Sequence, residues 1–133
     1  MRKLFYILFI SCFLSHISYG QNQKLIDSLR IALKGNTLTD KQRAIALSQL
    51  GWHSSYYDLG EGLKYAEEGY KIAKQNNYLS EMAHAANVIG TIYMDLGNYP
   101  QAIDYLQKAI SYNEQVNNKI SAAISASNLC IIY

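Results

Sequence analysis

The stretch 75–93 recurs forty residues later at 115–133, and this repetition constrains the fold more than any other feature of the chain. At an offset of 40 (115 − 75 = 40), six positions are identical, from Gln75 and Gln115 to Tyr93 and Tyr133. A period of this size is typical of stacked helical hairpins, because a single hairpin is too small to bury its own apolar face. The sequence therefore predicts an all-α chain of tandem antiparallel helical hairpins.

Apolar spacing and turn residues divide the chain into helices joined by short turns. Thr39 and Gln42 have the spacing of a capping box, in which two side chains satisfy orphan amides at a helix start. Pro100, the only proline, is expected in the first turn of a helix, where its missing amide costs nothing. The pattern predicts helices at about 24–33, 40–57, 61–75, 79–96, 99–116 and from 119 onward. These helices give an N-terminal capping helix at 21–38, repeats at 39–77 and 78–117, and an incomplete repeat at 118–133.

Four glycines lie inside the predicted helices, at positions 51, 62, 69 and 90. A glycine inside a helix costs about 0.5–1 kcal/mol relative to alanine. We therefore expect close helix–helix contact at these positions, with neutral drift in surface helices as the alternative. The first hairpin turn is predicted to be one residue shorter than the second. Gly51 and Gly62 are 11 residues apart (62 − 51 = 11), whereas Gly90 and Ala102 are 12 apart (102 − 90 = 12).

The first twenty residues have the layout of a secretory signal peptide. Two basic residues precede an apolar run over 4–14, and Ser18 and Gly20 place small side chains ahead of Gln21. The run is short for a bilayer span. We therefore predict a cleaved leader at 1–20 and an exported protein, periplasmic or extracellular after cleavage near Gly20. Retention of the leader as an anchor and lipidation of Cys12 are the alternatives.

Without the leader, the chain is close to electrical neutrality. Removal of two basic residues leaves 10 (12 − 2 = 10) against 10 acidic residues. This balance disfavours a nucleic-acid partner, which requires clustered cations to displace counterions. Cys130 would be the only cysteine left, so an internal disulfide is excluded. No other apolar segment approaches the length needed for membrane insertion.

The unit that begins near residue 83 has a regular arrangement of large and small residues. It contains Ala86-x-x-Ile89-Gly90-x-x-Tyr93, followed by Gly97-x-Tyr99-x-x-Ala102. This arrangement resembles the tetratricopeptide repeat, and the resemblance covers about 40–133. The preceding unit matches less well because Ser54 replaces the tyrosine, and the forty-residue period reaches the range of HEAT-type repeats. Longer helices account for that period. The resemblance implies a right-handed α-solenoid of the tetratricopeptide type.

The resemblance also implies a binding surface, because the first helix of each hairpin in such stacks lines a concave groove for a protein or peptide. The candidate groove residues are those expected to face away from the packing positions: Ser48, Trp52, Ser55, Tyr56, His84, Asn87, Thr91, Met94 and Asp95, with Ser127 and Ile131 in the last repeat.

Two of these candidates suggest specific interactions. Trp52 and Tyr56 lie four residues apart and could form an aromatic anchor for a partner or pack routinely against the helix at 24–33. Asn87 occupies a position where some peptide-binding family members carry a carboxylate-holding asparagine. Ser48 stands where the matching basic residue would be, so a terminal-carboxylate ligand is disfavoured.

Catalytic and metal-binding patterns are absent from the sequence. His53 and His84 lie on different predicted helices with no further ligands at metal spacing. We predict a chain without cofactor, without metal and without enzymatic activity. Its long-period form resembles the exported front part of certain bacterial sensor kinases and regulators. We therefore expect a protein- or peptide-binding region of a signalling protein.

The last predicted helix lacks a second helix to cover it, so its apolar residues would be partly bare. Repeat arrays usually finish with a polar capping element. We expect the chain to be a fragment of a longer protein. Homo-association through this C-terminal helix, giving a self-associating structural protein, is the alternative.

Overall fold

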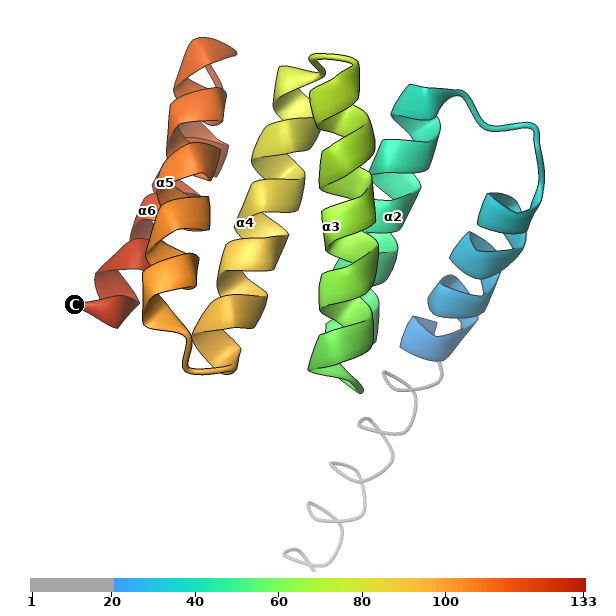
Figure 1. Cartoon of the computed structure of the whole chain (residues 1–133), viewed down its shortest axis with the longest axis horizontal. Helices are drawn as coiled ribbons and strands as arrows, with labels where there is room; N and C mark the ends of the chain where they lie inside the picture. The colour runs from blue at the N-terminus through green and yellow to red at the C-terminus, as the bar shows by residue number, and fades with distance from the viewer. Residues whose placement is uncertain (1–20) are drawn as a thin grey trace, which may run out of the picture.

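The computed structural model describes residues 21–133, which form a row of helices without a strand (Figure 1). Residues 21–34 are helical and precede five further helices. These are α2 (Asp40–Ser55), α3 (Leu59–Gln75), α4 (Leu79–Asp95), α5 (Tyr99–Gln115) and α6 (Lys119–Ile132). The predicted helical hairpins are confirmed, and the described ends of α2 to α6 lie within two residues of the expected positions. The first helix was predicted at 24–33 and is helical over 21–34. The predicted leader at 1–20 lies outside the described residues.

Side chains at the helix starts explain where these helices begin. The predicted capping box is present at α2, where the Gln42 amide donates to Thr39 Oγ1 at 3.3 Å. Asp58 accepts from the Glu61 amide at 3.0 Å, so α3 begins at Leu59, two residues before the predicted start. Asparagines cap α5 and α6 in the same way. Each cap satisfies an amide that has no partner inside its helix.

Three of the turns repeat one C-terminal hydrogen-bond pattern. After α3, the Tyr78 amide donates to the Ala73 carbonyl at 2.9 Å, and the residue between them in the turn, Asn77, has a φ of 55°. Gly97 and Asn117 repeat this left-handed conformation, with φ values of 72° and 56°. This pattern is the Schellman motif, which favours glycine and asparagine at its left-handed position. The turn after α2 has no such residue, yet it spans three residues, 56–58, as does the turn 96–98 of the second hairpin. The prediction of a shorter first turn was therefore wrong. Helix α2 ends four residues after Gly51 (55 − 51 = 4) and α4 ends five after Gly90 (95 − 90 = 5), so the one-residue difference lies in the helix.

The helices pack in two layers. Helices α2, α4 and α6 contact one another in order, and α3 and α5 pack against them from the other side. Figure 1 shows α5 lying in front of α6 and α3 in front of α2. The apolar core between the layers includes Ala66 of α3 and Val88, Ile89 and Ile92 of α4. Helix α4 packs against α3 of the first hairpin and against α5 of its own hairpin. It has eight buried residues, more than any other of the helices α2 to α6.

The predicted close contact at the helix glycines is confirmed. A Cβ atom at Gly51 would lie 2.8 Å from the Gly62 carbonyl oxygen, and one at Gly62 would lie 2.7 Å from the Gly51 carbonyl oxygen. The backbones of α2 and α3 therefore touch where the two glycines meet. A Cβ atom at Gly90 would instead meet the side chain of Leu106 at 2.8 Å. At these glycines, the helices of the first hairpin are thus in contact through backbone atoms, and those of the second hairpin through the side chain of Leu106.

Tyrosines join α3 to α5 on the outer layer. The ring of Tyr105 on α5 lies 5.9 Å from the ring of Tyr70 on α3 and 5.9 Å from that of Tyr93 on α4. The hydroxyls of Tyr70 and Tyr112 share a hydrogen bond of 3.1 Å. Burial and this hydrogen bond raise the pKa of Tyr70 well above its usual range, so its hydroxyl stays protonated.

The helical residues 21–34 pack against the first hairpin. Arg30 Nη2 donates to both carboxylate oxygens of Glu61, at 2.9 and 3.0 Å. Asn22 Nδ2 donates to the hydroxyl of Tyr57 at 3.1 Å, and Ile26 is buried. Among the described residues, no helix is both long and apolar enough to cross a bilayer.

Candidate binding groove

Two adjoining hollows lie along the layer formed by α2, α4 and α6. One has a volume of about 300 Å³ and is lined by residues of α4, α5 and α6 and by the turn before α6. The other has a volume of about 270 Å³ and is lined by residues of α2 and α4. Ser80 and His84 of α4 line both hollows. We call the two hollows together the groove.

One repeat position supplies the centre and both ends of the groove. Ile45 of α2, His84 of α4 and Ile124 of α6 are spaced by 39 and 40 residues (84 − 45 = 39, 124 − 84 = 40), and each lines a hollow. Ile45 and Ile124 are exposed. His84 is one of the predicted groove residues, whereas the two isoleucines are not. The repeat would have identified them, because Ile124 lies forty residues after His84, and Ile45 matches His84 when Gly51 is aligned with Gly90 (90 − 51 = 39).

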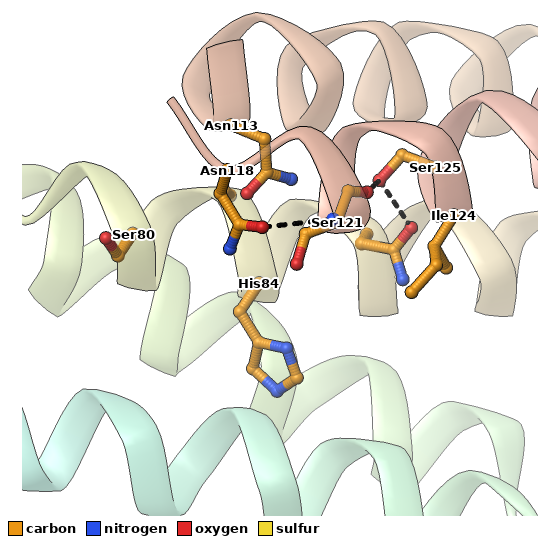
Figure 2. Close-up of a pocket in the computed structure, with 9 residues that line it drawn as sticks. Ser80, His84, Asn113, Asn118, Ser121, Ile124 and Ser125 are labelled. Atoms are coloured by element: carbon orange, nitrogen blue, oxygen red, sulfur yellow. Dashed lines mark hydrogen bonds between the residues drawn. The ribbon is translucent and has the colours of Figure 1, made fainter. Parts of the chain in front are cut away.

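Uncharged polar groups surround His84. Figure 2 shows His84 extending from α4 toward α2, whereas Asn118, Ser121 and Ser125 lie on the α6 side. Asn118 caps α6 by accepting from the Ser121 amide at 3.1 Å. Ser125 Oγ donates to Asn87 Oδ1 at 2.9 Å, and this bond holds α6 against α4. The hollow between these helices is lined by amides, hydroxyls, an imidazole and small apolar groups, without a charged side chain.

The hollow between α2 and α4 contains a single charged side chain, Glu81. Its carboxylate lies 3.4 Å from Lys41 Nζ and is 10% exposed, so its charge is compensated within the protein. Lys41 also lies above the ring of Tyr78, 5.8 Å from its centroid. The groove therefore carries no unpaired charge on its described walls.

The surroundings of His84 keep its imidazole neutral. The walls of the groove remove water from the ring although part of the side chain remains exposed, and this burial lowers the pKa of His84 below 6.5. The negative charge of Glu81 acts in the opposite sense and offsets part of the shift. A neutral imidazole offers one hydrogen-bond donor and one acceptor to a ligand.

Three of the predicted groove residues line the hollows: Ser48, His84 and Asn87. The expectation that all of them face away from packing positions was wrong for Ser48. It is 1% exposed, and its Oγ donates to the Ala44 carbonyl and lies 2.8 Å from where a Cβ of Gly69 would be. Ser48 thus fills the contact between α2 and α3. Asn87 uses its oxygen for α6, which leaves that atom less available to a ligand.

The predicted aromatic pair is present, but it does not line either hollow. The rings of Trp52 and Tyr56 lie 5.4 Å apart at 83°, an edge-on arrangement. Trp52 is half-buried and packs on the core cluster of α3 and α4, whereas Tyr56 is exposed. Ser55 is half-buried against Gly62. Trp52 is therefore part of the packing around the core. A role for Tyr56 in partner binding stays a prediction.

The remaining candidates lie further along α4 and α6, beyond the residues that line the hollows. Thr91 is half-buried and accepts from Asn128 Nδ2 of α6 at 3.4 Å. Met94 is half-buried and Asp95 is exposed at the end of α4. Ser127 and Ile131 are exposed on α6. Participation of these residues in binding stays a prediction.

The described residues offer no group of three or more histidine, cysteine, aspartate or glutamate side chains able to hold a metal ion. Within residues 21–133, His53 and His84 lie on separate helices, and Cys130 is exposed. The groove is concave, has apolar ends and carries neutral hydrogen-bonding groups, which are features of a ligand-binding site.

Residues 83–116 match the family model described as Tetratricopeptide repeat. The matched segment runs from α4 through the Gly97 turn to the end of α5, so it coincides with the second hairpin. No curated protein matches the chain. The second hairpin is thus similar to a tetratricopeptide repeat, and the all-helical stack of packed hairpins is consistent with a helical solenoid of that type.

Proposed function

We propose that this chain is a non-catalytic scaffold that binds a protein or peptide in the groove along α2, α4 and α6. The single observation that carries the proposal is the pair of adjoining hollows whose central residue, His84, is shared by both. Ligand sites are concave and combine apolar walls with a few polar groups that fix orientation. A repeat match over the second hairpin supports the same function class, because such repeats are interaction scaffolds.

Selection of peptides from a displayed random library by the immobilised chain tests this proposal. We expect enriched peptides whose affinity falls at least about tenfold for Ile45→Asp and Ile124→Asp, since each variant places an unpaired charge at an apolar end of the groove. Ile31→Asp is the matched control, because Ile31 is an equally apolar, 71% exposed residue outside the groove. Equal loss in the control, or no enrichment at all, would contradict the proposal.

We further propose that the scaffold is the exported sensory or interaction region of a bacterial signalling protein. The leader-like pattern at 1–20 and the near-neutral remainder of the chain support this proposal. A fusion of residues 1–133 to a reporter enzyme that is active only outside the cytoplasm should give an active reporter. Deletion of residues 2–14 should abolish that activity. An active reporter after the deletion would overturn the export proposal.

A second candidate function is self-association through α6. Ile120 and Ile131 on this helix are 77% and 72% exposed, and Tyr133, which follows the helix, is also exposed. Exposed apolar patches on monomers are usually small or functional. Light scattering across a concentration series should then show a dimer that Ile131→Asp converts to a monomer. A wild-type chain that stays monomeric at all concentrations would eliminate this candidate.

A further inference from the structure

The distribution of charge between the two helix layers differs sharply. No Asp, Glu, Lys or Arg occurs at 44–55 on α2, at 82–94 on α4 or at 120–132 on α6. The six charged residues of these helices lie near the helix ends, at positions 40, 41, 43, 81, 95 and 119. The outer helices contrast with this: α3 carries six such residues and α5 three, at positions 61, 64, 67, 68, 71, 74, 104, 108 and 114. The helices that form the groove are thus uncharged over their middle turns, whereas charged residues recur along the outer helices.

The neutral groove favours uncharged ligand groups over charged ones. A charged ligand group that leaves water must be paired, or the lost hydration is not recovered. The described walls offer one carboxylate, Glu81, and Lys41 already pairs with it at 3.4 Å. Burial lowers the pKa of His84, which favours the uncharged imidazole at the centre of the groove at neutral pH. Uncharged amides and hydroxyls, by contrast, find partners in Ser80, Asn118 and Ser121.

The spacing of the apolar ends bounds the length of the ligand. Packed helices lie about 8–10 Å apart, so equivalent positions on α2 and α6, with α4 between them, are separated by roughly 16–20 Å. An extended peptide advances about 3.3 Å per residue, so about five or six residues cover this distance. Ile45 and Ile124 mark the two ends, and His84 marks the middle.

We propose that the groove recognises an extended, uncharged peptide segment of about six residues, with apolar side chains at its ends for Ile45 and Ile124 and uncharged polar groups between them. This inference rests on the proposed peptide-binding function and adds the chemistry of the partner. Specificity arises because Asp, Glu, Lys or Arg in the middle of the segment would be dehydrated without a partner.

The composition of library-selected peptides tests this inference. Random dodecapeptides enriched on the purified chain should contain a window of about six residues that is depleted of charged residues relative to the input library. His84→Lys places a cation at an exposed position in the centre of the groove, and it should shift selection toward Asp and Glu in the same window. Lys71→Glu, on the outer face of α3, is the matched charge-changing control and should leave the selection unchanged.

The outcomes separate failure of this inference from failure of the proposed function. Enrichment of acidic or basic peptides whose binding still requires Ile124 would retain the groove as a peptide site and overturn its preference for uncharged segments. Identical selections by the wild-type chain and His84→Lys would overturn it as well. Peptides that bind equally to Ile124→Asp, or neutral oligosaccharides that bind where no peptide does, would overturn the peptide-binding function and this inference with it.

Discussion

His53 and His84 occupy different surroundings, yet the pKa of each lies below the ordinary value of 6.5. Burial is the first cause in both cases, because a charged imidazolium loses hydration when neighbouring atoms displace water. For His84 the nearby Glu81 partly opposes this effect. Folding therefore favours the neutral form of both imidazoles, and their protonation destabilises the folded state.

This property predicts a pH dependence of stability. The pKa of each histidine is lower in the folded protein than in the unfolded chain, so the unfolded chain binds more protons below about pH 6.5. The free energy of unfolding is therefore highest above that pH. It falls as the pH drops from about 6.5 through the folded-state pKa values. Thermal unfolding should show a lower midpoint at pH 5.5 than at pH 7.5. The double variant His53→Gln/His84→Gln should flatten this slope. An equal slope in wild type and variant would assign the dependence to other groups.

The repeat offset predicts which residues share a position but not what each side chain contacts. Ile45, His84 and Ile124 could be grouped from the sequence alone, since they are equivalent in the repeat. The contacts of Ser48 and Asn87 could not, because their partners lie on other helices. Asn87 bonds Ser125, 38 residues away, and Ser48 fits against Gly69 of α3. Side-chain contacts of this kind depend on how the helices are packed.

At the scale of helices, the crossing of α2 and α3 is the tightest contact of the first hairpin. We predict that Gly51→Ala lowers the free energy of unfolding by about 1–3 kcal/mol, because the new methyl group meets backbone atoms that cannot move away. This cost exceeds the gain of about 1 kcal/mol that alanine brings to a helix. Urea unfolding monitored by circular dichroism measures the change.

Two further substitutions calibrate that measurement. Gly90→Ala should cost less than Gly51→Ala, because the nearest backbone atom, Leu106 N, would lie at 3.2 Å, whereas backbone atoms lie at 2.8 Å from the new methyl group at Gly51. Gly35→Ala should change stability by less than about 0.5 kcal/mol, since its nearest neighbours would lie at ordinary contact distances of 3.5 and 3.7 Å. If Gly51→Ala and Gly35→Ala changed the free energy of unfolding equally, the contact between α2 and α3 would be able to widen without cost.

The attachment of α6 to α4 depends on polar contacts more than the other interfaces do. Ser125 is 1% exposed and donates to Asn87. We predict that Ser125→Ala lowers the stability of α6 by about 1 kcal/mol and raises its amide-exchange rates about fivefold, because the Asn87 oxygen loses its strongest partner. Ser127→Ala is the control, since Ser127 is exposed and bonds only within its own helix. Uniformly faster exchange throughout the chain would contradict a local role.

Helix ends were predictable because their determinants are local in sequence. Thr39 with Gln42 indicated the start of α2, and Gly97 and Asn117 marked two later turns. The start of α3 was placed two residues late. The predicted helix at 61–75 leaves Gly60 outside, whereas the Asp58 cap places it inside the helix. The choice between a glycine in a turn and a glycine in a first helical turn depends on cap geometry that the sequence alone does not resolve.

At the scale of the whole molecule, stability depends on how strongly neighbouring hairpins are coupled. The core between α3 and α4 provides one connection. Tyr105 provides another, because its ring contacts Tyr70 of the first hairpin as well as Tyr93 of its own. The sequence predicted the hairpins without this second connection, since aromatic contacts between α3 and α5 require the stack to be assembled.

We predict that Tyr105→Ala lowers the free energy of unfolding by about 2–4 kcal/mol, through lost burial and two lost ring contacts. The urea m-value should fall as well, because a weakened interface lets α5 and α6 open before α2 and α3. Amide exchange should accordingly become faster in α5 and α6 than in α2. Tyr99→Ala is the matched control, because Tyr99 lies on the same helix but is 52% exposed. A lower midpoint with an unchanged m-value would mean that packing between α3 and α4 alone holds the hairpins together.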